Sequence, residues 1–167
     1  MIKLSHALFV NFLSLLIITG YYDNLMEELH SEIFNLKYGT EEKYYGKQEF
    51  SVTVTMYNPT RGQTDKTPNI TADGTKINPN RASQYRYVAL SRDLLKRWGG
   101  PFNYGDYIAI KGTEKYDGIY QVRDTMNPRF VDRVDILRTK GDARFKYENI
   151  TLYKYTEEEV SELSYMD

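Results

Sequence analysis

The chain has 167 residues, a formal net charge of −1 and no cysteine. A chain of this length forms one domain with a modest core, its charge gives no electrostatic basis for nucleic-acid binding, and the lack of cysteine excludes disulfides and a thiol nucleophile. The two histidines, His6 and His30, both precede the predicted domain, which excludes a Ser-His-Asp triad or a histidine-based metal site within it.

Residues 1–20 are predicted to be a signal peptide or a membrane anchor. Lys3 is followed by an apolar run from Ala7 to Thr19, whose length suits the core of a signal peptide and is short for a membrane span. No small-x-small cleavage pattern precedes Tyr21, so an uncleaved inner-membrane anchor is the alternative. We expect this segment to direct export to the periplasm or cell envelope.

Residues 21–45 are predicted to form an amphipathic helix followed by a linker. Leu25, Leu29, Ile33 and Leu36 recur at helical spacing along one face. This helix packs on the following domain, pairs with another copy of the chain, or spaces the domain from the membrane. The sequence leaves these three alternatives open.

Residues 46–156 are predicted to form a β domain, and residues 157–167 an acidic tail. The run from Phe50 to Tyr57 alternates apolar and polar residues, which indicates a half-buried strand whose polar face lines a groove. Five further strands are expected at 87–90, 106–111, 118–122, 133–137 and 148–155. Six strands with one short helix are typical of a small closed barrel.

The short helix is expected just after the second strand, in the segment SRDLLKRWGG. Ser91 suits the N-cap, Leu94, Leu95 and Trp98 are expected to face the core, and Gly99 ends the helix. Before it, the long loop at 58–84 is rich in turn-forming residues, and loops of that length in compact domains usually carry function or are disordered.

One aspartate lies at the end of a predicted strand and another lies inside the next strand. Asp124 follows the run 118–122, and Asp135 lies between Val134 and Ile136. A carboxylate flanked by such residues must be hydrogen-bonded or have a raised pKa. Paired acids cleave glycosidic bonds, whereas the alternative is structural: Asp124 caps a turn and Asp135 accepts from backbone amides.

Four stretches, in order, resemble the 3D domain, a family named for its three aspartates and found in lytic transglycosylases of the MltA type and in stationary-phase cell-wall proteins. Together they cover roughly residues 50–155. The stretches are TMYNPTRGQTDKTPNITADGT (55–75), YVALSRDLL (87–95), YGDYIAI (104–110), and DTMN (124–127) with VDI (134–136). The chain departs from the family at Ser91, where an aspartate is usual.

The resemblance implies a six-stranded double-psi β-barrel with a short helix. It also implies a peptidoglycan-active protein that cleaves the glycan strand without metal or cofactor, with Asp124 as acid/base and Asp135 as the partner that tunes it. The alternatives are a non-catalytic module that binds glycan or protein, and a structural envelope protein that assembles through residues 21–39. The expected substrate-binding residues are Tyr57, Asn58, Thr71, Asp73, Gly74, Ser91, Thr125 and Asn127.

Tyrosine is abundant, with 16 residues in the chain. Tyr57, Tyr85, Tyr104 and Tyr120 offer flat faces for stacking on sugars and hydroxyl groups for hydrogen bonds. The alternative is that they are ordinary strand residues.

Overall fold

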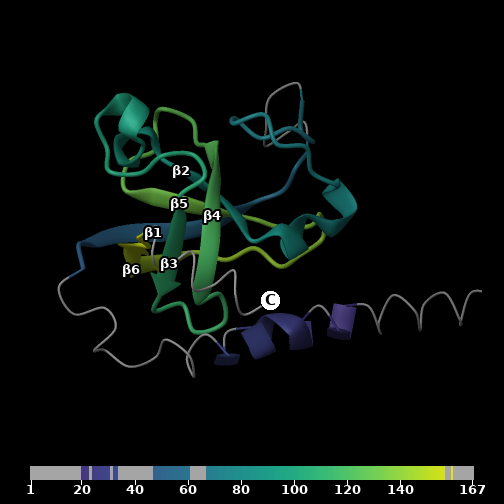
Figure 1. Cartoon of the computed structure of the whole chain (residues 1–167). Helices are drawn as coiled ribbons and strands as arrows, with labels where there is room; N and C mark the ends of the chain where they lie inside the picture. The colour runs from purple at the N-terminus through teal and green to yellow at the C-terminus, as the bar shows by residue number, and fades with distance from the viewer. Residues whose placement is uncertain are drawn as a thin grey trace, which may run out of the picture.

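Six β-strands form one closed barrel in the order β1-β5-β2-β4-β3-β6 (Figure 1). The computed structural model describes residues 20–22, 24–30, 32–33, 47–60, 67–156 and 159. The strands are β1 (Glu49–Tyr57), β2 (Tyr87–Leu90), β3 (Tyr107–Lys111), β4 (Gly118–Thr125), β5 (Arg133–Leu137) and β6 (Tyr147–Lys154). The expectation of a mainly β fold with six strands in a ring is confirmed.

Four of the five connections between consecutive strands pass over an intervening strand, and two of them position the candidate site. β1 is parallel to β5, and β5 is antiparallel to β2, so β5 lies between the consecutive strands β1 and β2. β2 is also parallel to β4, so β2 lies between the consecutive strands β4 and β5. The second of these connections, from β4 to β5, decides how the candidate site is assembled.

The barrel interior is filled by one side of each strand, as the two-residue period of strands requires. Its fully buried members include Val54, Val88, Val122, Val134 and Ile136. A second apolar cluster covers part of the outside of the barrel. Its buried members are Tyr57, Ile77, Ala82, Ala89, Met126 and Leu137. The outer face of this half of the barrel is therefore partly covered, and Thr55, Asp124 and Asp135 on that face stay half-buried.

The segment between β1 and β2 supplies part of that outer cover. The described residues of this segment include a 3-10 helix, η2 (Pro79–Tyr85). Asn78 caps it, because its side chain accepts a hydrogen bond from the backbone N–H of Asn80 at 3.0 Å. Ala82 of η2 is fully buried against the outside of the barrel.

The segment after β2 does not form the expected continuous helix. It forms two short 3-10 turns, η3 (Arg92–Leu94) and η4 (Lys96–Trp98), separated by Leu95 in an extended conformation. Leu95 forms a parallel bridge with Phe102, which interrupts the helix. Phe102 is fully buried, whereas Trp98 is 40% exposed, so the expectation that Trp98 lies in the core is wrong.

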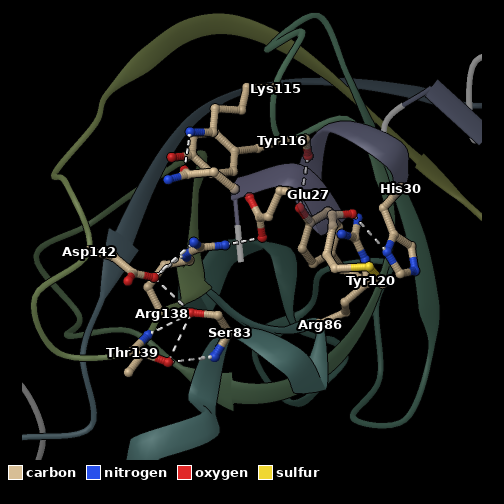
Figure 2. A network of polar contacts seen from close by, with 12 residues as sticks. Glu27, His30, Ser83, Arg86, Lys115, Tyr116, Tyr120, Arg138, Thr139 and Asp142 are labelled. Atoms are coloured by element: carbon tan, nitrogen blue, oxygen red, sulfur yellow. Dashed lines mark hydrogen bonds and ion pairs between the residues drawn. The ribbon is translucent and has the colours of Figure 1, made fainter. Parts of the chain in front are cut away.

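A helical segment N-terminal to the barrel comprises residues 20–22, 24–30 and 32–33. Its polar face contacts the barrel: Lys115 donates to Asn24, and Arg138 pairs with Glu27 (Figure 2). Of its predicted apolar face, Leu25, Leu29 and Ile33 are exposed. The face that was predicted to be apolar is therefore not the face that meets the barrel.

No helix in the described ranges is long and apolar enough to cross a membrane. Residues 1–19, Leu36 and the acidic tail other than residue 159 lie outside the described residues. The signal-peptide or anchor prediction for residues 1–20 and the domain boundaries stay predictions.

Candidate functional site

A row of four residues in register crosses the outer face of the barrel. Thr55 on β1 is opposite Asp135 on β5, Asp135 is opposite Ala89 on β2, and Ala89 is opposite Asp124 on β4. Interior residues flank Asp135 and Ala89 and precede Thr55, so these three face outward. Asp124 faces the same way, because it accepts a hydrogen bond from Tyr57 of the outer apolar cluster. We call the four residues the polar row, with the small Ala89 at its centre.

A β-bulge in β4 sets the direction of Asp124. Val88 is opposite Val122 but Ala89 is opposite Asp124, so Arg123 is the extra residue in the ladder. In a regular ladder Arg123 would be opposite Ala89, and Asp124 would then face the apolar interior. Bulges commonly re-aim side chains in this way, and here the bulge places Asp124 in the polar row.

Three hydrogen bonds hold the Asp124 carboxylate. Its Oδ2 accepts from the Tyr57 hydroxyl at 2.9 Å, and its Oδ1 accepts from the backbone N–H groups of Ala72 at 3.0 Å and Thr125 at 2.8 Å. Two of the three donors are backbone amides. Asp124 therefore fastens the β1–β2 segment to β4, which fits the structural alternative for this residue.

Asp135 occupies a half-buried position on β5 and accepts a hydrogen bond from the Thr55 hydroxyl. Burial raises the pKa of Asp135, an effect that the Thr55 hydrogen bond and the Arg133 charge reduce and that the charge of Asp124 reinforces. The expectation that this carboxyl is hydrogen-bonded or has a raised pKa is confirmed on both counts.

The two aspartates are not brought together by a hairpin, as the short connection between their strands suggested. β2 lies between β4 and β5, so their backbones are two strand spacings apart, roughly 9–10 Å. The residue between them is Ala89, which is buried in the outer apolar cluster. The acids therefore share one face and influence each other electrostatically, but a strand separates them.

The turn at 71–75 lies beside Asp124 and contains three of the expected substrate-binding residues. The Thr71 hydroxyl donates to Asp73 at 2.6 Å, and Arg123 pairs with the other Asp73 oxygen at 2.9 Å. Burial acts to raise the pKa of Asp73, but these contacts outweigh it and lower the pKa. Gly74 has a φ of 90°, which glycine adopts readily.

Tyr57 is 7% exposed, and burial, followed by the charge of Asp124, raises its pKa well above the usual value. Its hydroxyl donates a hydrogen bond to Asp124, and its burial leaves no ring face open to a sugar. Tyr120 is 2% exposed and has the Arg86 guanidinium on its ring, 4.1 Å from the centroid. The stacking role suggested for these two tyrosines is wrong because their faces are covered.

The other two tyrosines are half-buried. Tyr85 stacks on Tyr87 at 5.3 Å between centroids, and the Tyr104 hydroxyl shares a 2.7 Å hydrogen bond with the Thr125 hydroxyl. Thr125 ends β4 next to the polar row, so Tyr104 and Thr125 remain accessible polar neighbours of Asp124.

The remaining expected substrate-binding residues lie apart from the polar row or support the fold. Asn58 is buried and donates to the carbonyl oxygens of Arg138 and Thr139. Asn127 is exposed and accepts from the backbone N–H of Arg129. Ser91 is fully buried, and its Oγ accepts from the backbone N–H of Arg133 at 3.0 Å rather than capping a helix.

Sequence reasoning missed three residues of this face as site residues: Thr55, Ala89 and Arg123. The alternation of 50–57 marked Thr55 as outward-facing, so that signal was present. Ala89 becomes central only because β2 is inserted between the two acidic strands. Arg123 depends on the bulge, for which no sequence signal was noted.

The polar row places two carboxyl groups and the Thr55 hydroxyl on one face of the sheet. Such groups can form hydrogen bonds with the hydroxyls of a sugar. Asp135 supplies a carboxyl whose protonated form is favoured by burial, and Asp124 supplies an acceptor. Within the ranges that the structure describes, no group of three His, Cys, Asp or Glu residues is arranged to hold a metal ion.

No protein-family model matches the chain, and no curated protein matches it. Among solved structures, a mutant of Clavibacter michiganensis expansin in complex with cellohexaose matches with 17% identity and a TM-score of 0.42, over 66% of this chain and 52% of that chain. The match to the same expansin without ligand has 17% identity, a TM-score of 0.41 and the same coverage.

A Streptomyces papain inhibitor matches with 18% identity and a TM-score of 0.41, over 65% of this chain and 96% of that chain. The matched region spans about half of the length of the expansins. At this degree of similarity the family of the chain is not assigned.

Proposed function

We propose that this protein is an envelope module that binds the glycan strand of peptidoglycan across the polar row on the outside of a double-psi barrel. The observation that carries the proposal is the row Thr55–Asp135–Ala89–Asp124, which presents hydroxyl and carboxyl groups around one small residue. The resemblance of four ordered stretches to the 3D domain supports the same substrate class. The expected export through residues 1–20 would place the module beside that substrate.

Binding is favoured over cleavage by the hydrogen bonds of Asp124 and by the serine at position 91. Asp124 is committed to three hydrogen bonds, two from backbone amides. The usual third aspartate is replaced by Ser91, whose side chain is fully buried and holds β5. The chain therefore keeps hydrogen-bond acceptors for a sugar, but it lacks one of the three aspartates usual in the 3D domain.

The test of binding is co-sedimentation of the purified full chain with insoluble peptidoglycan. We expect Asp135→Asn, with its altered acceptor in the polar row, to weaken retention about tenfold, as the loss of a charged hydrogen bond does. Glu148→Gln is the matched control, because Glu148 is an exposed carboxylate on β6, outside the row. Retention of Asp135→Asn equal to that of the unmodified chain would contradict the proposal.

Glycan cleavage with a 1,6-anhydro product is the second candidate, and one observation favours it. Burial raises the pKa of the Asp135 carboxyl, so this candidate assigns the general acid to Asp135. Mass spectrometry of the released fragments tests this candidate. Anhydro-muropeptides that disappear in Asp135→Asn would support cleavage, and their absence with the unmodified chain would leave binding alone.

A further inference from the structure

Two loops next to the polar row lie side by side at one end of β2 and β5. The backbone N–H of Ser91 donates to the carbonyl oxygen of Arg133 at 2.9 Å, and the backbone N–H of Asp132 donates to Asp93 Oδ2 at 3.0 Å. The segment 91–99 is thereby fastened to the segment 127–133. These contacts make one continuous surface from residues of both loops.

Each loop carries an aromatic ring with two arginines against it. The guanidinium carbons of Arg92 and Arg97 lie 4.9 and 5.3 Å from the centroid of the Trp98 ring. Those of Arg129 and Arg133 both lie 4.7 Å from the centroid of the Phe130 ring. We call these six residues the arginine–aromatic surface.

An aromatic ring orients a guanidinium group without using its hydrogen-bond donors. The planar group is attracted to the negative face of the ring, while its N–H groups remain available for bidentate contact with a carboxylate or phosphate. Because the ring restricts the side chain beforehand, less conformational entropy is lost when an anion binds. The four arginines are thus held ready for acceptors.

No acceptor from the described part of the chain satisfies them. None of the four guanidinium groups forms an ion pair there, and the Nε atoms of Arg92 and Arg133 are buried without a hydrogen-bond partner. By contrast, Arg123 and Arg138 are ion-paired. Buried donors without partners cost free energy. The guanidinium groups of Arg97 and Arg129 are exposed and therefore open to a ligand from outside.

The net charge of the two loops, 91–99 and 127–133, is opposite in sign to that of the whole chain. Arg92, Lys96, Arg97, Arg129 and Arg133 contribute five positive charges, and Asp93 and Asp132 contribute two negative ones, a balance of 5 − 2 = +3. The formal charge of the whole chain is −1. Burial, then the neighbouring charge of Asp93, raises the pKa of Asp132. Such local asymmetry attracts an anionic partner.

We infer that the arginine–aromatic surface binds the anionic groups, carboxylate or phosphate, of a polysaccharide whose sugar rings lie on the polar row. This inference rests on the proposed function and extends it. Arg133 connects the two regions, because it lies two residues before Asp135 on the same face of β5 and its charge acts on Asp135. The arginine–aromatic surface therefore lies beside the polar row, displaced from it along β5.

The test compares three soluble polymers of similar length with the purified full chain by isothermal titration: neutral dextran, polygalacturonate and phosphorylated dextran. The variant is Arg97→Gln with Arg129→Gln, two exposed residues whose replacement leaves the core intact. The matched control is Arg81→Gln with Arg144→Gln, which removes the same charge from exposed positions elsewhere. A single-stranded oligonucleotide of equal charge is the competitor.

We expect the Arg97/Arg129 variant to bind one or both anionic polymers about tenfold more weakly, the control variant to bind them as the unmodified chain does, and added salt to reduce the difference. The polymer that responds identifies carboxylate or phosphate as the ligand group. Equal losses in both variants, or no loss in either, would overturn the inference. Tighter binding of the oligonucleotide than of either anionic polymer would also overturn it.

Failure of this inference is distinguishable from failure of the proposed function. If Asp135→Asn weakens peptidoglycan retention while Arg97/Arg129 changes nothing, the polar row binds glycan and the arginine–aromatic surface does not. If Arg97/Arg129 loses anionic polymer while Asp135→Asn keeps full retention, the inferred surface stands and the polar row is not the glycan site.

Discussion

The Asp135 side chain is partly buried, and burial raises its pKa. It lies half-buried on the outer face of β5, accepts from the Thr55 hydroxyl, and belongs to the polar row. Its raised pKa has burial as the largest cause, so the folded protein favours the protonated form more than the unfolded chain does. This preference makes the stability of the fold depend on pH.

The sign of that dependence follows from linkage. Because the folded state binds the proton more tightly, the contribution of Asp135 to stability is greatest below the ordinary aspartate pKa of about 3.9 and falls as pH rises through the raised value. We expect Asp135→Asn to remove this fall, so that its stability relative to the unmodified chain increases between about pH 4 and 7. Urea unfolding across that range measures it, and parallel pH profiles for the two proteins would contradict it.

Ser91 shows how one residue constrains what its site can do. Its side chain is fully buried, and both its N–H and its Oγ are hydrogen-bonded to the backbone of Arg133. An aspartate here would accept from the same N–H, so either residue serves the fold. Ser91 makes these contacts without placing a charge at a fully buried position, where the resemblance to the 3D domain leads us to expect an aspartate.

At the scale of elements, the segment from Ser91 to Phe102 shows a strand-like bridge overriding a helical pattern. Lys96 N–H donates to the carbonyl oxygen of Phe102 at 2.7 Å, and Phe102 N–H donates to that of Leu94 at 3.0 Å. These bonds consume groups that a helix would use internally and place Phe102 in the core. Trp98 is left on the surface.

This arrangement predicts unequal costs for two aromatic truncations. Phe102→Ala should lower the free energy of unfolding by about 3–5 kcal/mol, since it removes a fully buried ring. Trp98→Ala, at a position 40% exposed, should cost less than about 1 kcal/mol. Chemical denaturation of both variants checks the difference. Similar losses would mean that Trp98 packs into the fold after all.

At the scale of the whole molecule, the helical segment before the barrel is held by polar contacts to residues more than 80 positions away in sequence. Figure 2 shows Glu27 pointing from that segment toward Arg138, which also pairs with Asp142. Arg138 is only 6% exposed, and the charges of Glu27 and Asp142 raise its pKa although burial acts to lower it. The ion pair is therefore well shielded from solvent.

Glu27→Gln should release the segment from the barrel. Removing one partner of a buried pair typically costs about 3–5 kcal/mol, and a detached helix of this length is marginal in water. We expect amide exchange at 24–30 to accelerate at least about tenfold while the amides of β2 and β4 keep their rates. Glu28→Gln, an exposed neighbour, is the control. Unchanged exchange in Glu27→Gln would show that other contacts hold the helix.

Sequence alone determined the strands and their facing. The alternation from Phe50 to Tyr57 predicted β1 and turned Thr55 outward, and the prediction for 133–137 coincides with β5. The flanking apolar residues also predicted that Asp135 is hydrogen-bonded or has a raised pKa. These features depend on the two-residue period of a strand and on the cost of burying charge, both of which are local.

Only the tertiary structure decided which strands are neighbours. The connection from β4 to β5 passes over β2, which places Ala89 between Asp124 and Asp135 and separates acids that the chain order put side by side. The bridge of Leu95 to Phe102 likewise displaced Trp98 from the core. Alternation determines which residues share a face, whereas strand order depends on long-range pairing across the closed barrel, and no local pattern encodes that pairing.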